Sequence, residues 1–190
     1  EGAPARVEVA CRWRSAEASP VTVEIDLEVA GETFAAPPAV HRVTATVAPG
    51  VSETVHALEI PEPRLWWTWD TGAQDLYRLE VRTADGTALG ETVFGVREVR
   101  RDDGTMVYTV NGRRLFLRGV WYPFANIFSA LPTEAEHRRD VEMLRECGCN
   151  HLVSFTFVEK PAFYDACDRL GLLVMQELPY QQLGPMKAVD

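Results

Sequence analysis

The chain has 190 residues, a little more than one domain at roughly 150 residues per domain, so two unequal domains are expected. Its 46% hydrophobic and 25% charged residues are ordinary for a globular protein and exclude a disordered or collagen-like chain. With 19 basic against 28 acidic residues, the net charge of −9 argues against a nucleic-acid partner. No run approaches the roughly 18 to 20 apolar residues of a membrane-spanning helix, so no membrane partner is expected.

The chain start and the cysteines bear on compartment and cofactors. Glu1-Gly2-Ala3-Pro4 does not resemble a signal peptide, so we expect either a cytoplasmic protein, which we prefer, or a secreted one whose leader lies outside this sequence. Four cysteines are too few for a disulfide-stapled scaffold, and Cys147-Gly148-Cys149 lacks the two-residue spacer of a zinc or redox motif. We therefore interpret the cysteines as small buried apolar residues and expect neither a metal nor a cofactor.

From residue 6 to about residue 118 the chain alternates between apolar and polar residues in short segments separated by turn residues. This pattern is typical of an all-β fold. Asn111-Gly112 suits a type I′ hairpin turn and predicts that Thr109 and Arg113 lie close together. About seven strands in roughly 100 residues favour an immunoglobulin-like sandwich. The expected strands are Arg6–Trp13, Val21–Ala30, Val40–Val47, Glu53–Ile60, Leu76–Arg82, Glu91–Val99 and Met106–Val110, the last paired with Arg114–Arg118.

After about residue 115 the pattern changes to alternating strands and helices. Leu115–Val120 is predicted to be a short buried strand, and Thr133-Glu134-Ala135-Glu136 is a capping box that predicts a helix start. That helix carries Val141, Leu144 and Cys147 on one side, with Ala135 and Met143 flanking, and should end at Gly148. His151–Phe157 is the next expected strand, a helix begins at Pro161 and ends at Gly171, and the strand Leu172–Glu177 follows.

The order strand, helix, strand, helix, strand predicts parallel strands buried on both faces. An eight-stranded α/β barrel takes about 250 residues, so residues 114–190 would supply only its first three strands. A doubly wound sheet is the alternative, but the connection from Trp121 to Pro132 has no Gly-rich phosphate loop, which also argues against a dinucleotide enzyme. The predicted fold is an all-β immunoglobulin-like sandwich over residues 1–113, followed by an incomplete α/β (TIM-barrel-type) βαβαβ segment over residues 114–190.

Five segments resemble, in order, the sequence of glycoside hydrolase family two, in the style of its β-mannosidases. They are Pro63-Arg64-Leu65-Trp66-Trp67 with Gln74-Asp75-Leu76-Tyr77-Arg78-Leu79; Phe94-Gly95-Val96-Arg97-Glu98; Val110-Asn111-Gly112-Arg113-Arg114-Leu115-Phe116-Leu117-Arg118-Gly119-Val120; Asp140-Val141-Glu142-Met143-Leu144 with Cys149-Asn150; and Pro161-Ala162-Phe163-Tyr164-Asp165-Ala166-Cys167-Asp168-Arg169-Leu170-Gly171-Leu172-Leu173-Val174. Each is weak alone, but together they cover residues 60 to 177 in the family's order.

The resemblance implies a function for a longer parent protein. Members of the family hydrolyse β-glycosides with retention, using two glutamates roughly 5 to 5.5 Å apart and no organic cofactor. The resemblance places both glutamates on later barrel strands, about the fourth and the seventh, so this chain is expected to lack them and to be inactive alone. We expect a fragment of an exo-acting β-mannosidase-like or β-galactosidase-like enzyme with a carbohydrate substrate. The alternative is a non-catalytic immunoglobulin-like scaffold or carbohydrate-binding module.

Four residues at strand ends are the candidate substrate-binding residues: Trp121, Tyr122, Phe157 and Glu177. Barrel active sites form at the C-terminal ends of the strands, where aromatic rings can stack on a sugar. By resemblance, the acidic position at Glu177 is a structural or sugar-pocket residue rather than a catalytic one. The alternative for the three aromatic residues is simple core packing.

Three departures from the family pattern also lie at these strand ends. Val153 stands where the family usually has an arginine, Thr156 stands where galactosidase-like members have a histidine, and Trp121 replaces the usual asparagine. Altered specificity or a weakened site is therefore expected. The crowded Trp66, Trp67 and Trp69 are interpreted as packing residues rather than a sugar platform. Incomplete barrel edges also predict that the isolated chain is poorly ordered beyond about residue 120 or self-associates.

Overall fold

The computed structural model describes residues 3–122, 132–155 and 158–178. Within them the chain divides into two compact units. One contains the residues up to Leu65 together with Asp75–Val96, and the other contains Trp66–Gln74 together with the residues from Arg97 onward. The predicted domain boundary between residues 113 and 114 stays a prediction. The two compact units are interleaved in sequence, so no single boundary in the sequence separates them.

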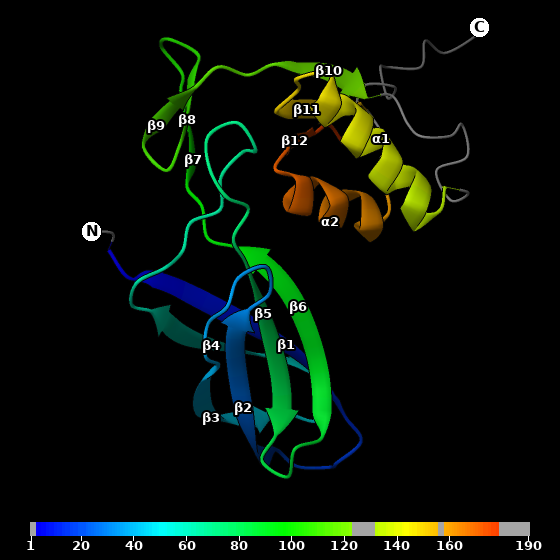
Figure 1. Ribbon diagram of the computed structural model, residues 1–190. Coiled ribbons are helices and arrows are strands. Elements are labelled where there is room, and N and C mark those ends of the chain that lie inside the picture. Colours follow the sequence, from blue (N-terminus) through cyan, green and yellow to red (C-terminus); the bar gives the residue numbers. More distant parts are fainter. Residues whose placement is uncertain (1–2, 123–131, 156–157, 179–190) are drawn as a thin grey trace, which may run out of the picture. The chain divides into compact units, whose positions relative to one another are not determined.

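The first unit is the predicted immunoglobulin-like β-sandwich. Inward-facing residues alternate with outward-facing ones along its first four strands, and the core between the sheets includes Ile25, Leu27, Leu58 and Tyr77. A four-stranded antiparallel sheet has the order β3-β2-β5-β6, and β1 pairs with β4 in a second sheet (Figure 1). The bounds are β1 Ala5–Ser15, β2 Val21–Gly31, β3 Ala39–Val47, β4 Gly50–Ile60, β5 Leu76–Thr83 and β6 Ala88–Gly95.

The second unit begins with a small antiparallel sheet of β7 (Val99–Asp102), β8 (Val107–Val110) and β9 (Arg113–Leu115). The expected strand Glu91–Val99 is therefore two strands, β6 and β7. The side-chain Oδ1 of Asn111 accepts a hydrogen bond from the Glu98 N–H at 2.8 Å and so engages the backbone just before β7. The predicted Asn111-Gly112 turn is present, with both residues at positive φ. It pairs Val110 with Arg113 and Thr109 with Arg114, so Thr109 and Arg113 are diagonal neighbours across the hairpin.

The rest of the second unit is the start of an α/β barrel. Three parallel strands have the order β10-β11-β12, and α1 and α2 connect them (Figure 1). Thr133 caps α1 with the predicted capping box, Pro161 begins α2, and Gly171 ends α2 in the left-handed conformation. The bounds are β10 Gly119–Tyr122, α1 Glu134–Glu146, β11 His151–Ser154, α2 Pro161–Leu170 and β12 Leu173–Gln176.

Two expectations about this unit need correction. The strand expected at Leu115–Val120 begins only at Gly119, because the Asn150 side chain forms hydrogen bonds with the backbone groups that precede Gly119. Its Oδ1 accepts the Arg118 N–H at 2.9 Å, and its Nδ2 donates to the Phe116 carbonyl at 3.1 Å. On α1, the buried residues are His137 and Val141, whereas Met143 and Cys147, expected on or beside the apolar side, are exposed.

The tryptophan loop, residues 66–74, packs into the second unit. The Trp66 ring is fully buried and donates from Nε1 to the Asp168 carbonyl at 2.7 Å, while Trp69 donates from Nε1 to the Cys149 carbonyl at 2.7 Å. The Trp69 N–H also donates to the Gly171 carbonyl. A Cβ at Gly171 would lie 2.6 Å from the Trp69 nitrogen, so only glycine fits this contact. The loop therefore holds the N-terminal ends of β11 and β12 together.

Asp70 is the charged anchor of the tryptophan loop. Its carboxylate accepts hydrogen bonds from Arg118 at 2.8 Å and from Asn150 at 2.9 Å, and its side chain is only 15% exposed. Burial alone would raise the pKa of Asp70, but hydrogen bonds from Thr68, Asn150 and Arg118 outweigh burial and lower this pKa below its ordinary value. The carboxylate is thus held ionised at the base of the barrel strands.

Asp70→Ala is expected to lower the free energy of unfolding by about 2 kcal/mol, because it removes charge-assisted hydrogen bonds and leaves the buried Asn150 amide short of a partner. Urea unfolding followed by tryptophan fluorescence measures the change. Glu142→Ala is the control, since its ion pair with Arg138 is exposed and should contribute less than about 0.5 kcal/mol. Equal effects of the two substitutions would contradict the anchoring role of Asp70.

The lowered pKa of Asp70 also predicts a pH dependence. A carboxyl group whose pKa is lower in the folded state than in the unfolded state stabilises the folded protein. This stabilisation is complete above the pKa of the unfolded state and is lost as the pH falls through the pKa of the folded state. Between pH 5 and pH 2.5, the unfolding free energy of wild type should therefore fall more than that of Asp70→Asn. If the unfolding free energies of the two proteins, measured by urea titration, change in parallel with pH, Asp70 is not the group whose protonation lowers the stability.

Candidate functional site

The C-terminal ends of β10, β11 and β12 form the candidate site, because the three strands are parallel and in register. Trp121 lies beside Val153, and Val153 lies beside Met175, so these three side chains form one row on the sheet. Helices α1 and α2 cover the opposite face, where Leu152 lies in the core with Val141 and Phe163. The row of Trp121, Val153 and Met175 therefore faces away from the helices. In a closed α/β barrel this face of the sheet lines the interior.

Trp121 supplies an exposed aromatic surface at this edge. Its side chain is 69% exposed, and its ring stacks on Phe155 with the ring centroids 5.1 Å apart and the planes 7° apart. Phe155 follows β11 and lies two residues beyond Val153, so alternation along the strand places it on the same face. Sequence reasoning missed Phe155, although its spacing from Val153 was the available signal. The two rings form an aromatic platform of the kind that stacks on the apolar face of a sugar.

Tyr122 lies on the other side of the sheet from Trp121. Its ring is buried against Phe163, with the ring centroids 5.1 Å apart, and its hydroxyl donates to the Asp140 carboxylate at 2.7 Å. Burial and the neighbouring Asp140 carboxylate raise the pKa of the Tyr122 phenol far above its ordinary value. The structure thus separates Trp121 from Tyr122, and Tyr122 attaches α1 to the sheet.

Glu177 directly follows β12 at the same edge. Its N–H donates to the Ser154 carbonyl at 3.1 Å, which continues the parallel ladder one residue beyond the strand. The position is two residues beyond Met175, which places its side chain on the face of Trp121 and Phe155 by alternation. The side chain is half-buried. Phe157, the fourth candidate, and Thr156 lie outside the described residues.

The middle of the row is apolar. Val153 is almost fully buried between its neighbours Trp121 and Met175. The acidic residues of α2 are engaged elsewhere, because Asp165 pairs with Arg169 at 2.9 Å and Asp168 pairs with Arg97 at 3.1 Å. Among the described residues of this edge, Glu177 is thus the candidate for binding sugar hydroxyls through a carboxylate.

The layer beneath the row is filled by His151. A Cβ at Gly119 would lie 2.3 Å from the His151 carbonyl oxygen and 2.5 Å from its Nδ1, so the glycine leaves room for the imidazole. Burial lowers the pKa of His151, which keeps the ring neutral at pH 7. Sequence reasoning missed His151, because its role depends on a contact with the neighbouring strand. The imidazole forms part of the floor under the aromatic platform.

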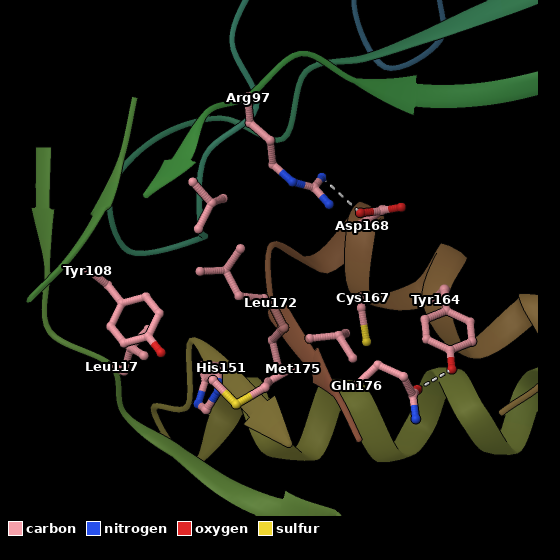
Figure 2. Close-up of a pocket in the computed structure, with 13 residues that line it drawn as sticks. Arg97, Tyr108, Leu117, His151, Tyr164, Cys167, Asp168, Leu172, Met175 and Gln176 are labelled. Atoms are coloured by element: carbon pink, nitrogen blue, oxygen red, sulfur yellow. Dashed lines mark hydrogen bonds and ion pairs between the residues drawn. The ribbon is translucent and has the colours of Figure 1, made fainter. Parts of the chain in front are cut away.

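A groove of about 410 Å³ runs along the outer edge of β12. Figure 2 shows the Arg97–Asp168 ion pair at one end and the hydrogen bond from the Tyr164 hydroxyl to Gln176 at the other. In the described part of the chain, no strand pairs with this edge. Apolar side chains make most of the lining between the two polar ends: Val99, Leu117, Leu172, Leu173, Val174 and Met175. Such a lining suits a further strand and its helix better than a small polar molecule.

Both parts of the chain match known protein families. Residues 1–97 match the model of the glycosyl hydrolases family 2, and residues 100–190 match the TIM barrel domain of the same family. An exo-β-D-glucosaminidase from Streptomyces avermitilis is 30% identical over 70% of this chain and 15% of its own length. A β-galactosidase from Thermoanaerobacter pseudethanolicus is 32% identical over 70% of this chain and 18% of its own length.

Solved structures agree with the family matches. The crystal structure of a β-D-mannosidase from Dictyoglomus thermophilum superposes with a TM-score of 0.81 at 25% identity, over 94% of this chain and 23% of the mannosidase. The chain therefore spans less than a quarter of each of these three relatives. With both of its parts matched in order, the chain belongs to glycosyl hydrolase family 2 and contains an immunoglobulin-like sandwich and the start of the TIM barrel domain.

Proposed function

We propose that this chain is part of a retaining, exo-acting β-glycosidase of the β-mannosidase or β-galactosidase type, whose substrate is a carbohydrate. The family membership supports glycoside hydrolysis in the whole protein. The observation that carries the proposal is the aromatic platform of Trp121 and Phe155 at the strand ends, where barrel enzymes bind substrate, with Glu177 on the same face of the sheet by alternation. In this proposal Trp121 and Phe155 stack on the sugar and Glu177 accepts hydrogen bonds from its hydroxyl groups.

The two other candidate residues have different places in this proposal. Phe157 is kept as a substrate-contacting residue because it follows the same strand. Tyr122 is assigned a positioning role, since its hydroxyl is bonded to Asp140 and its ring lies on the helix-covered face. Both catalytic glutamates are proposed to lie on later strands of the whole protein, so the 190-residue chain has no acid/base and nucleophile pair.

The isolated chain has a second candidate role, as a non-catalytic scaffold or carbohydrate-binding module. The exposed Trp121 favours it, because this ring is available to a sugar without the rest of the barrel. No helix among the described residues is long and apolar enough to cross a membrane. Either a cytoplasmic or a secreted location remains open to the whole protein, and the cytoplasm stays our prediction. Self-association of the isolated chain through the open edges of β10 and β12 also stays a prediction.

The isolated chain is expected to release no aryl alcohol from aryl β-mannosides or β-galactosides above the rate of a blank without protein. The whole protein encoded by the same gene is expected to hydrolyse at least one of them with retention, which proton NMR of the first-formed sugar anomer reports. Turnover by the isolated chain that Glu177→Gln abolishes would contradict the placement of the catalytic residues. A whole protein inactive on all aryl glycosides would favour the binding-module role.

Trp121→Ala in the whole protein is expected to lower kcat/KM by roughly 3- to 10-fold, because loss of one aromatic stacking contact costs about 0.5 to 1.5 kcal/mol. Steady-state kinetics with the preferred aryl glycoside measures the change. Phe116→Ala is the matched control, since Phe116 is an exposed aromatic residue that precedes β10. Equal losses in the two variants would contradict a substrate contact for Trp121.

A further inference from the structure

The backbone of Glu177 is held on both sides of its Cα atom. Its N–H donates to the Ser154 carbonyl at 3.1 Å, and its own carbonyl accepts a hydrogen bond from Nε2 of Gln176 at 2.7 Å. Because peptide groups are planar, fixing the two that flank a residue also fixes its φ and ψ angles. These two angles set the direction in which the Glu177 side chain leaves the backbone.

The Tyr164 hydroxyl orients the amide group of Gln176. A main-chain carbonyl only accepts hydrogen bonds, so the amide nitrogen of Gln176 must face Glu177 and the amide oxygen must face elsewhere. The Tyr164 hydroxyl donates to this oxygen at 2.5 Å, as Figure 2 shows. Reversal of the amide would bring its oxygen against the Glu177 carbonyl oxygen. Tyr164 therefore favours the one orientation in which Gln176 can hold Glu177.

Tyr164 is itself fixed in place. Its ring packs edge-on against Phe163, with the ring centroids 5.3 Å apart and the planes at 82°, and its hydroxyl accepts the Glu159 N–H at 3.2 Å. Burial raises the pKa of the Tyr164 phenol, so the hydroxyl keeps its proton and stays a donor at neutral pH. The Tyr164–Gln176 network thus runs from the Glu159 N–H through Tyr164 and Gln176 to the Glu177 carbonyl.

We propose that Tyr164 and Gln176 are positioning residues for the sugar site, because they hold the Glu177 backbone so that its carboxylate faces the sugar hydroxyl groups. This inference rests on the proposed function, which assigns Glu177 to those hydroxyl groups. Neither positioning residue contacts the sugar: Tyr164 belongs to α2, and alternation places Gln176 on the helix-covered face. A carboxylate held in its binding orientation loses less conformational freedom when the sugar binds.

Simple attachment of α2 to the sheet is the alternative role of the network. The apolar core already provides this attachment, because Phe163 and Cys167 of α2 are buried with Leu152 of β11. The network ends instead on a carbonyl that lies beyond β12, whose last residue is Gln176. Its last hydrogen bond thus fixes Glu177 rather than the strand, which favours the positioning role.

A double-mutant cycle in the whole protein tests the proposal. Tyr164→Phe and Gln176→Ala are each expected to lower kcat/KM for the preferred aryl glycoside by roughly tenfold. In a Glu177→Ala background, each should change kcat/KM by less than about twofold, because the group through which they act is absent. A contact that only stabilises the fold would have the same effect in both backgrounds.

Tyr77→Phe is the matched control. This substitution also removes a tyrosine hydroxyl that accepts a backbone N–H, from Arg64 at 2.7 Å, but the hydroxyl lies in the β-sandwich. The variant is expected to keep the wild-type kcat/KM. Urea unfolding of every variant, followed by tryptophan fluorescence, establishes that each is folded under the conditions of the assay.

Hydrogen exchange of the whole protein provides a readout that needs no substrate. The Glu177 amide is expected to exchange roughly tenfold faster in Tyr164→Phe and in Gln176→Ala than in wild type, while the amides of His151–Ser154 in β11 stay protected. Mass spectrometry of peptides that cover residues 172–178 measures the rates. A whole protein without glycosidase activity would contradict the proposed function, and these exchange rates would still test the network.

Three results would overturn the inference. The first is a wild-type kcat/KM in both Tyr164→Phe and Gln176→Ala. The second is an equal loss of kcat/KM in the wild-type and Glu177→Ala backgrounds, and the third is an unchanged exchange rate at Glu177 in both variants. A wild-type kcat/KM in Glu177→Ala alone would instead contradict the sugar contact that the proposed function assigns to Glu177.

Discussion

The carboxylate of Asp70, with the Asn150 amide that it binds, is the interaction on which the barrel part of the structure depends. Asn150 uses each side of its amide group: the oxygen accepts the Arg118 N–H, and the nitrogen donates to Asp70 and to the Phe116 carbonyl. This arrangement fixes where β10 and β11 begin relative to each other. Because parallel strands keep their register along their length, it also sets which residues lie side by side at the far end, where Trp121 and Val153 are neighbours.

The elements that sequence reasoning placed well are specified by local signals. The Thr133 capping box, Pro161 at the start of α2 and the Asn111-Gly112 turn all act within four residues, so their consequences can be inferred without a fold. The errors arose where a distant side chain binds the backbone. The Asn150 side chain forms a hydrogen bond with the backbone just before β10, and the Asn111 side chain forms one with the backbone between β6 and β7. Nothing in the local sequence of either segment records these contacts.

The candidate site was predictable to the same extent. Strand ends in an α/β pattern indicate where a site forms, which was enough to select Trp121 and Glu177. Adjacent residues of a strand point to opposite faces, however, so Trp121 and Tyr122 could not both face the barrel interior. Which of them does so is decided by the helices: α1 offers Asp140 as a hydrogen-bond acceptor and α2 offers Phe163 as a stacking surface, and both engage Tyr122. The space for His151 above Gly119 depends on the neighbouring strand in the same way.

The interleaving of the two compact units has a consequence for how such a protein can be rearranged in evolution. Trp66–Gln74 belongs to the barrel unit, while the segments on either side of it belong to the sandwich. A single crossover in the gene therefore cannot replace one whole unit by the same unit of a homologue and leave the other unit unchanged. A hybrid joined near residue 97 would combine a foreign tryptophan loop with native partners at Arg118 and Asn150. A hybrid of two distant relatives joined at this position is therefore expected to fold only when its Trp66, Trp69 and Asp70 fit the barrel residues that they contact.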